Sequence, residues 1–320
     1  IAKRLCSLRS EQYTLDEKNF EISLRQFASV TGCALNEDQT KAVRIAGENG
    51  VTVITGGPGT GKTTIIRALV SFLSSCNKSC LLAAPTGRAA KRMTEACGIQ
   101  AKTIHRLLEF SGDDADDDTE LTFKRDERNP IEADVLIIDE LSMVDTLLMY
   151  HLLKALPDRI QLILVGDKDQ LPSVGPGNVL KDILSSGLFS TVTLSQIYRQ
   201  NNESLIAWNA HQINHGKMPE FNRKNGDFFL IKRADLQSCA ETVVELCAKR
   251  LPNAYGIDPL RDIQVLIPAK KGICGALHMN ELLQETLNPP ESYKREFFIN
   301  NTVYREGDRI MQIKNNYDIL

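Results

Sequence analysis

Eight consecutive residues, Gly56–Thr63 (GGPGTGKT), fit the pattern G-x-x-x-x-G-K-[ST], which is typical of loops that bind nucleotide phosphates. The apolar run Val51–Thr55 precedes them and a helical run, TIIRALVSFL, follows, as the pattern requires. Glycines let backbone N–H groups surround phosphate oxygens, and the positive end of a helix adds to the attraction. We therefore expect ATP here, with Lys62 charged between the β- and γ-phosphates and Thr63 on Mg²⁺. The expected nucleotide contacts in this segment are Gly57, Pro58, Gly59, Thr60, Gly61, Lys62, Thr63 and Thr64.

Two adjacent carboxylates could supply the metal ligand and the base that ATP hydrolysis needs. The segment Asp134–Ser142 reads DVLIIDELS, an apolar strand that ends at Asp139 and Glu140. We expect this strand beside that of the phosphate loop, so that Asp139 joins the Mg²⁺ shell. Glu140 would then lie nearer the open edge, where water attacks.

Three further polar residues are candidates for the same site. Gln170 follows the apolar run Gln161–Gly166, where its amide suits a sensor of the γ-phosphate or of the attacking water. Arg199, in SQIYRQ, falls where one α/β pattern gives way to another and could reach the γ-phosphate across a cleft. Gln39, in LNEDQTKAV, could read adenine. For each, an ordinary polar turn or surface side chain is the alternative.

Alternating strands and helices must position these residues. Short helices are expected over residues 1–35. Beyond them, helical stretches separate five β-rich runs, which predicts a mostly parallel sheet with helices on both faces. A second α/β unit is expected after Gln200, with a strand at Ile263–Pro268 and a strand pair at Val303–Ile313 turning at Glu306–Gly307. The five runs are Val51–Thr55, Cys80–Ala84, Asp134–Asp139, Gln161–Gly166 and Thr191–Leu194.

Composition restricts the function classes only weakly. The chain is 42% hydrophobic and 25% charged with a net charge of −3, as in a globular protein without a strong nucleic-acid signature. Six acids fall within Asp113–Glu120, beside Leu121–Lys124, which alternates like a strand, so a hairpin or an unstructured loop is expected there. The eight cysteines form no C-x-x-C pair, which favours reduced thiols and a cytoplasmic protein. No apolar run is long enough to predict a membrane partner.

In order, the motifs resemble those of superfamily 1 helicases. They are most similar to the RecD-like branch, which includes the alpha subunit of bacterial exodeoxyribonuclease V. The resemblance runs from about Leu35 to the end of the chain, and its most branch-specific segments are APTGRAA and TIHRLLE. The matching segments are LNEDQTKAV, GGPGTGKTT, APTGRAAKRM, AKTIHRLLE, IIDELSMVD, VGDKDQLPSVGPG, LSQIYRQ, VLIPAKKG and REGDRIMQIKNNYD.

The resemblance implies tandem RecA-like P-loop NTPase lobes: a helical lead-in (1–35), a first lobe (36–200) with a hairpin insertion at about 111–128, and a partial second lobe (201–320) ending where an SH3-like insertion begins. It further implies a motor that moves 5′→3′ on single-stranded DNA, unwinds at a duplex junction in recombination and repair, and could join other exodeoxyribonuclease V subunits. The implied DNA contacts are Thr86, Arg88, Thr103, His105, Lys270 and Lys271.

The sequence departs from the family pattern because the last two motifs, including a further arginine, are absent. We therefore expect this chain, as an excised or processed fragment, to bind nucleotide but hydrolyse it poorly. Three alternatives remain: a P-loop ATPase that acts on a protein partner and ignores DNA, a nuclease, and a degenerate scaffold. Intact Lys62, Asp139, Glu140 and Gln170 argue against the scaffold.

Overall fold

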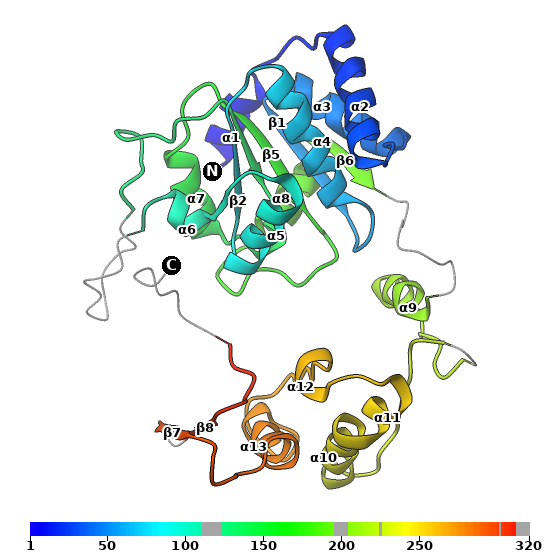
Figure 1. The fold of residues 1–320 in the computed structure, drawn as a ribbon. Helices are drawn as coiled ribbons and strands as arrows, with labels where there is room; N and C mark the ends of the chain where they lie inside the picture. The colour runs from blue at the N-terminus through cyan, green and yellow to red at the C-terminus, as the bar shows by residue number, and fades with distance from the viewer. Residues whose placement is uncertain (111–122, 195–203, 224–225, 301, 312–320) are drawn as a thin grey trace. The chain divides into compact units, whose positions relative to one another are not determined.

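A computed structural model describes residues 1–110, 123–194, 204–223, 226–300 and 302–311. They form two compact units, Ile1–Glu220 and Phe221–Leu320, and each is considered by itself (Figure 1). Among the described residues, none of the helices combines the length and the apolar character that crossing a membrane demands.

The first unit is built on one six-stranded sheet in which all neighbours are parallel, in the order β3-β2-β4-β5-β1-β6. The five β-rich runs of the sequence all form strands, which confirms that expectation, and β3 is an additional short strand at one edge. Strands β1, β4 and β5 are buried along their whole length, as expected for parallel strands covered on both faces. The strands are β1 (Val51–Gly56), β2 (Cys80–Ala84), β3 (Ala101–Thr103), β4 (Val135–Ile138), β5 (Gln161–Gly166) and β6 (Ser190–Leu194).

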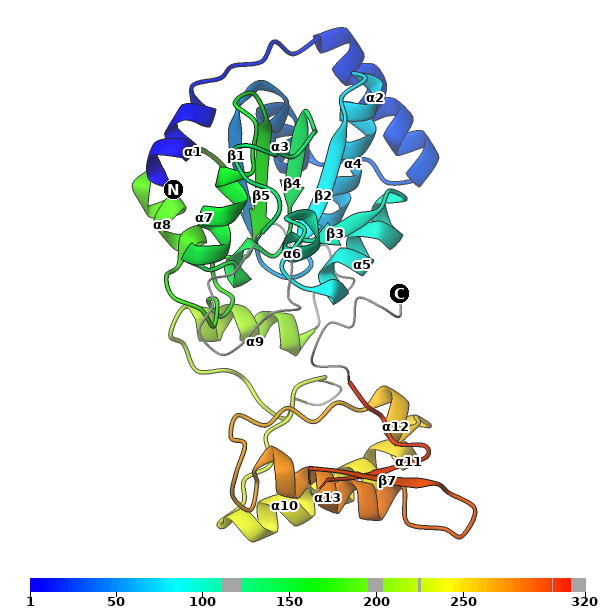
Figure 2. The ribbon, with the colours of Figure 1, turned by 90° about the vertical axis from the view of Figure 1, so that its left-hand side faces the viewer.

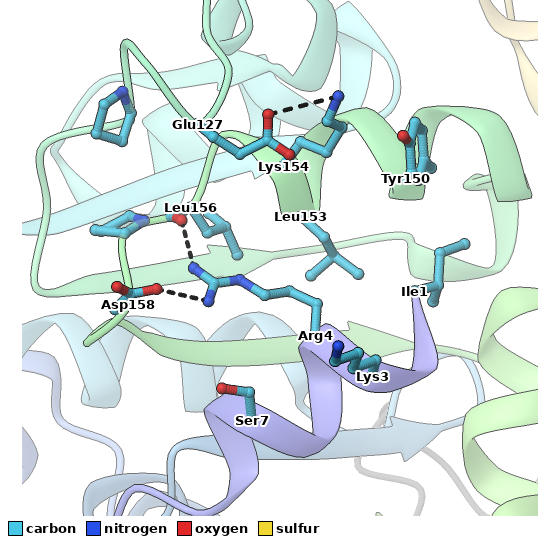
Figure 3. A pocket seen from close by; sticks show the side chains of 12 residues that line it. Ile1, Lys3, Arg4, Ser7, Glu127, Tyr150, Leu153, Lys154, Leu156 and Asp158 are labelled. Atoms are coloured by element: carbon cyan, nitrogen blue, oxygen red, sulfur yellow. Dashed lines mark hydrogen bonds and ion pairs between the residues drawn. The ribbon is translucent and has the colours of Figure 1, made fainter.

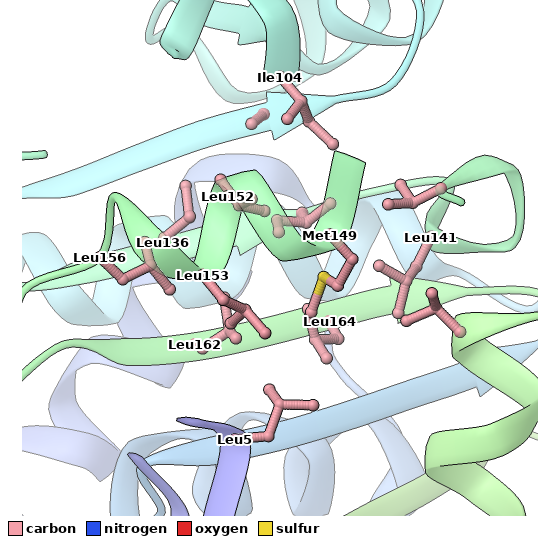
Figure 4. Close-up of a cluster of buried hydrophobic side chains, with 14 of the residues drawn as sticks. Leu5, Ile104, Leu136, Leu141, Met149, Leu152, Leu153, Leu156, Leu162 and Leu164 are labelled. Atoms are coloured by element: carbon pink, nitrogen blue, oxygen red, sulfur yellow. The ribbon is translucent and has the colours of Figure 1, made fainter. Parts of the chain in front are cut away.

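Helices cover both faces of this sheet because successive strand residues point to opposite sides. Ile54, Ile137 and Ile163 pack in one apolar cluster with α2 to α5, whereas Val53 and Leu136 pack in the other with α1, α6, α7 and α8 (Figure 2). In the second cluster, Leu5 of α1 lies beside β1, and Met149 of α7 lies next to Leu164 of β5 (Figure 4). The helices of this unit are α1 (Ala2–Arg9), α2 (Glu17–Thr31), α3 (Glu37–Glu48), α4 (Lys62–Ser75), α5 (Gly87–Cys97), α6 (Ile104–Leu107), α7 (Thr146–Lys154), α8 (Val179–Ser186) and α9 (Leu205–Asn214), with a 3₁₀ turn η1 (Leu141–Met143).

The strand order corrects one expectation about the site. We expected Asp139 on the strand next to the phosphate loop, but β5 lies between β1 and β4 and pairs with both. Register places Val53 opposite Leu164, and Ile138 also opposite Leu164 on the other side of β5. Asp139 therefore follows the second strand from β1, although all three strands end at the same edge of the sheet.

The second unit consists of helical segments and one antiparallel hairpin. The expected strand at Ile263–Pro268 is wrong: these residues lie in no strand, and Leu266 is 86% exposed. The expected pair is also misplaced, because Ile299 pairs with Thr302 and the chain turns before β8, while Gly307 follows it. The elements are α10 (Leu236–Glu245), a π-helical turn η2 (Leu246–Arg250), α11 (Leu251–Tyr255), α12 (Pro259–Asp262), α13 (Ala276–Leu287), β7 (Glu296–Ile299) and β8 (Thr302–Arg305).

Candidate functional site

The loop between β1 and α4 has the backbone conformation that its glycines predict. Gly61 caps α4 at φ +87°, in the left-handed region that side chains disfavour. At Gly56, an added Cβ would collide with the hydroxyl of Thr60 and with Leu194. Thr60 is itself buried and its hydroxyl donates to the Gly57 carbonyl at 2.8 Å. The loop is thus closed by its own side chains, and the expected strand–loop–helix context is confirmed.

Lys62 begins α4 and folds back over this loop. Its Nζ donates to the carbonyl oxygens of Gly56 and Gly57, at 2.5 and 3.0 Å. The ammonium is therefore held at the loop itself, where a phosphate group would meet a positive charge. Thr63 and Thr64 follow in the first turn of the same helix.

Asp139 lies at the same edge, after β4. The pKa of its carboxyl is raised to about 6, mainly by burial and in part by the charge of Glu140. The backbone N–H of Glu140 and the Lys62 ammonium act in the opposite direction. The Glu140 N–H donates to Asp139 Oδ1 at 2.9 Å. A poorly solvated carboxylate within electrostatic reach of the phosphate-loop lysine fits a Mg²⁺ ligand, because a bound cation would stabilise its charged form.

Glu140 adopts an unusual backbone conformation. Its φ of 55° and ψ of 40° lie in the left-handed region, where it caps the 3₁₀ turn η1. A residue other than glycine is uncommon there, and such local strain concentrates at functional sites. Its side chain is half-buried, at the end of β4 where a general base was expected.

Gln170 lies on an exposed loop after β5. This strand lies between β1, which leads into the Lys62 loop, and β4, which leads to Asp139. Two backbone bonds shape this loop: the Gln170 N–H donates to the Asp167 carbonyl at 3.3 Å, and the Lys168 N–H to the Thr55 hydroxyl at 3.3 Å. Asp167 and Thr55 are both buried. Neither residue was predicted from the sequence, although Asp167 directly follows an apolar run, as Asp139 does.

Gln39 is not a surface residue, so the alternative considered for it is wrong. It is 5% exposed and forms a capping box at the start of α3: its Oε1 accepts from the Asn36 N–H at 3.1 Å, and its own N–H donates to Asn36 Oδ1 at 2.7 Å. The nitrogen end of its amide packs directly against Gly61. The helix preceding β1 is therefore fitted to the phosphate loop through this one side chain.

The four expected DNA contacts of the first unit share one edge of the sheet. Thr86 and Arg88 follow β2, whereas Thr103 ends β3 and His105 follows it; Ala84 of β2 pairs with Thr103. The hydroxyls of Thr86 and Thr103 act as N-caps, accepting from Ala89 at 3.2 Å and from Arg106 at 3.1 Å, while Arg88 is exposed. These loops are thus fixed in place by their threonines, leaving the arginine available to a partner.

His105 lies in a cluster of rings. It is 5.9 Å from Phe110 and 6.1 Å from Phe123, measured between ring centroids. The pKa of His105 is lowered by burial, although the charge of Asp145 acts in the opposite direction. Phe110 and Phe123 form an antiparallel bridge, so the residue before the expected insertion pairs with a residue within it. Residues 111–122, and with them most of the expected hairpin, lie outside the described residues.

The remaining candidates cannot be placed at this edge. Arg199 lies outside the described residues. Lys270 and Lys271 are exposed in the second unit, in a loop where the Leu277 N–H donates to the Lys270 carbonyl at 3.2 Å. They stay predictions.

A cavity of about 720 Å³ opens elsewhere in the first unit, between α1 and the end of α7 (Figure 3). It contains none of the expected nucleotide or DNA contacts. Arg4 pairs with Asp158 at 2.8 Å and Lys154 with Glu127 at 3.5 Å, so four of the charged side chains on its wall are paired with one another. We do not assign the nucleotide to this cavity.

In this sheet the buried strand β1 leads into the loop with Lys62, and Asp139 follows β4, two strands away from β1. This arrangement defines a P-loop NTPase of the RecA-like type. Two family models match the chain: the AAA domain over residues 39–176 and the SH3 domain of ATP-dependent RecD-like DNA helicases over residues 279–319. The second match includes the segment REGDRIMQIKNNYD, which the motifs had led us to expect in the second lobe.

Individual relatives carry related names. The chain is 35% identical over 285 residues to the ATP-dependent RecD2 DNA helicase of Deinococcus radiodurans, covering 89% of this chain and 36% of that protein. It is 39% identical over 171 residues to the RecBCD enzyme subunit RecD of Mycolicibacterium smegmatis, covering 46% of this chain and 30% of that subunit. The Pif1 helicase of Candida albicans is similar in structure, with a TM-score of 0.43 and 22% identity, over 69% of this chain and 55% of that one.

The chain is thus similar to RecD-like helicases over most of its length. It spans about a third of the length of these two bacterial relatives.

Proposed function

We propose that this chain is the motor core of an ATP-dependent DNA helicase, which couples ATP hydrolysis to movement along single-stranded DNA. The observation that carries the proposal is the common sheet edge shared by the phosphate loop with Lys62, the carboxylates Asp139 and Glu140, and the loops of Thr86 and Thr103. A nucleotide-dependent change at one part of this edge has only neighbouring strands to cross before it reaches the other.

Each residue has a distinct proposed role. Lys62 neutralises charge on the phosphates, and Thr63 with Asp139 would hold Mg²⁺, which supplies charge stabilisation when bound. Glu140 accepts a proton from the attacking water, and Gln170 orients that water or the γ-phosphate. Gln39 fixes the phosphate loop and would face the nucleotide, and Arg199 would reach the γ-phosphate.

The proposed substrate is single-stranded DNA next to a duplex junction. Arg88 and His105 in the first unit, with Lys270 and Lys271 in the second, would contact it, while Thr86 and Thr103 shape the loops. Movement in the 5′→3′ direction, a role in recombination and repair, and association with subunits like those of RecBCD are proposed from the family alone. The RecBCD subunit names belong to the relatives.

The test is the rate of ATP hydrolysis by the full-length protein with and without single-stranded DNA. We expect strong stimulation by DNA, and a loss of at least about 100-fold in Lys62→Ala, because that change removes a charge aimed at the reacting phosphate. Arg88→Ala is the matched variant on the DNA side: it should raise the DNA concentration needed for stimulation and leave the rate without DNA unchanged.

A second candidate, a P-loop ATPase that acts on a protein partner, shares Lys62, Thr63 and Asp139. It predicts hydrolysis that is sensitive to Lys62→Ala but indifferent to DNA and to Arg88→Ala. That pattern would replace the motor proposal.

A further inference from the structure

The loops that leave the adjacent strands β4 and β5 are locked together. The Thr146 N–H, at the start of α7, donates to the carbonyl of Pro176 at 3.0 Å. Gly175 and Gly177 flank this bond so closely that a Cβ on either would overlap the side chain of Asp145 or Thr146. The loop carrying Gln170 therefore rests on the loop carrying Glu140 without room for a side chain between them.

One side-chain bond crosses this contact close to the expected chemistry. The hydroxyl of Ser142 donates to Gln170 Oε1 at 3.3 Å. Ser142 is 7% exposed and lies in η1, two residues after Glu140, whereas Gln170 is exposed. The buried hydroxyl is held by the turn, so it is the fixed partner and the glutamine amide is the one that it orients.

The direction of this bond decides which end of the amide is left for a ligand. An amide has one accepting oxygen and one donating nitrogen. With Oε1 engaged by Ser142, Nε2 has no acceptor among the residues that the structure describes, and it can only donate. Phosphate oxygens only accept hydrogen bonds, so this orientation suits a γ-phosphate. A flipped Gln170 amide would face the phosphate with its own oxygen, which cannot donate.

We propose that Ser142 is a positioning residue for ATP hydrolysis: it holds the Gln170 amide with its nitrogen toward the γ-phosphate and ties that amide to the turn that carries Glu140. The proposal rests on the function proposed above for Gln170 and Glu140. Loss of one neutral hydrogen bond changes an equilibrium by roughly 3- to 10-fold. We therefore expect Ser142→Ala to lower kcat for ATP by about that factor, with little change in KM.

The experiment is a double-mutant cycle on the full-length protein, with Ser142→Ala, Gln170→Ala and the double variant, and with Ser142→Thr as the conservative control. We expect Ser142→Ala to reduce kcat only where Gln170 is present, and threonine, which keeps a hydroxyl, to restore most of the rate. A purely structural role for Ser142 predicts instead independent losses that multiply in the double variant, together with a lower unfolding midpoint. That result, or an unchanged kcat in Ser142→Ala, would overturn the proposal.

A second readout does not depend on turnover. If Gln170 senses the γ-phosphate, wild type should prefer a non-hydrolysable ATP analogue over ADP, and Ser142→Ala should reduce that ratio of affinities about 3- to 10-fold. An unchanged ratio would reject the positioning role. Hydrolysis that ignores DNA would reject the motor proposal alone, because the Ser142 effect is measured equally well on basal hydrolysis and on nucleotide binding.

Discussion

Replacing Gly61 by alanine separates two costs that the phosphate loop combines at one position. The backbone there has φ +87°, and a Cβ would overlap the amide nitrogen of Gln39. Gly98, the residue that caps the C-terminus of α5, is a matched control: its φ is +72°, but nothing lies within 4 Å of an added Cβ. Gly98→Ala therefore reports backbone strain alone.

The magnitudes follow from these two terms. A left-handed backbone costs a residue with a Cβ roughly 1–2 kcal/mol. The collision adds the loss of the Gln39 capping box, about 1 kcal/mol. We expect Gly61→Ala to lower the free energy of unfolding by about 2–3 kcal/mol and Gly98→Ala by about 1–2 kcal/mol.

The assay is urea unfolding of Gly61→Ala, Gln39→Ala and the double variant, followed by circular dichroism and by the fluorescence of the single tryptophan, Trp208, which lies in the same unit. Because Gln39→Ala already removes the capping box, the double variant should cost no more than Gly61→Ala alone. The coupling free energy between the two sites should then be about 1 kcal/mol.

Costs that simply add, or a Gly61→Ala variant no less stable than Gly98→Ala, would refute the reasoning. Either result would mean that the Gln39 amide moves aside without loss, so that α3 and the phosphate loop are not fitted to each other.

Two further predictions concern buried polar groups. Because the pKa of Asp139 is raised to about 6, the folded protein binds a proton more tightly than the unfolded chain, so its stability falls as the pH rises from about 4 to 6. Asp139→Asn should be about 2–3 kcal/mol more stable than wild type above that window and equal to it near pH 4, in urea titrations with a metal chelator; a constant difference across pH would contradict this. Gln161 is 0% exposed and its Nε2 donates to the carbonyls of Ala46, Gly47 and Asn49 at 3.2–3.3 Å. Gln161→Leu should therefore lower the free energy of unfolding by about 2–4 kcal/mol, whereas Gln26→Leu on the exposed face of α2 should change it little; equal effects would show that the carbonyls find other donors.

The sheet of the first unit could be predicted because its strands are covered on both faces and so are apolar throughout. Strand β3 was missed because its three residues, Ala101–Thr103, carry no such run. The strand order could not be obtained, since pairing joins residues far apart in the sequence, and this is why Asp139 was placed one strand too close to the phosphate loop. In the second unit, Ile263–Pro268 has the composition of a strand but pairs with no neighbour in the described part of the chain.

The phosphate loop was predictable because its chemistry fixes residue types at fixed spacing. The environment of the other site residues was not. Neither the burial of Gln39 against Gly61 nor the left-handed backbone of Glu140 has a signature in the residue types, because both depend on tertiary contacts. The Ser142–Gln170 bond is of the same kind: it joins loops 28 residues apart.

The bridge between Phe110 and Phe123 has a consequence for engineering. Phe110 and Phe123 pair with each other on the first unit, with the two rings 5.5 Å apart and Phe123 also 4.8 Å from His151. Lengthening a segment between two paired residues costs little free energy, since doubling the length of a flexible loop costs only about 0.6 kcal/mol. Phe110 and Phe123 thus mark an insertion site, between which a fluorescent reporter or a foreign module could be placed without disturbing the phosphate loop.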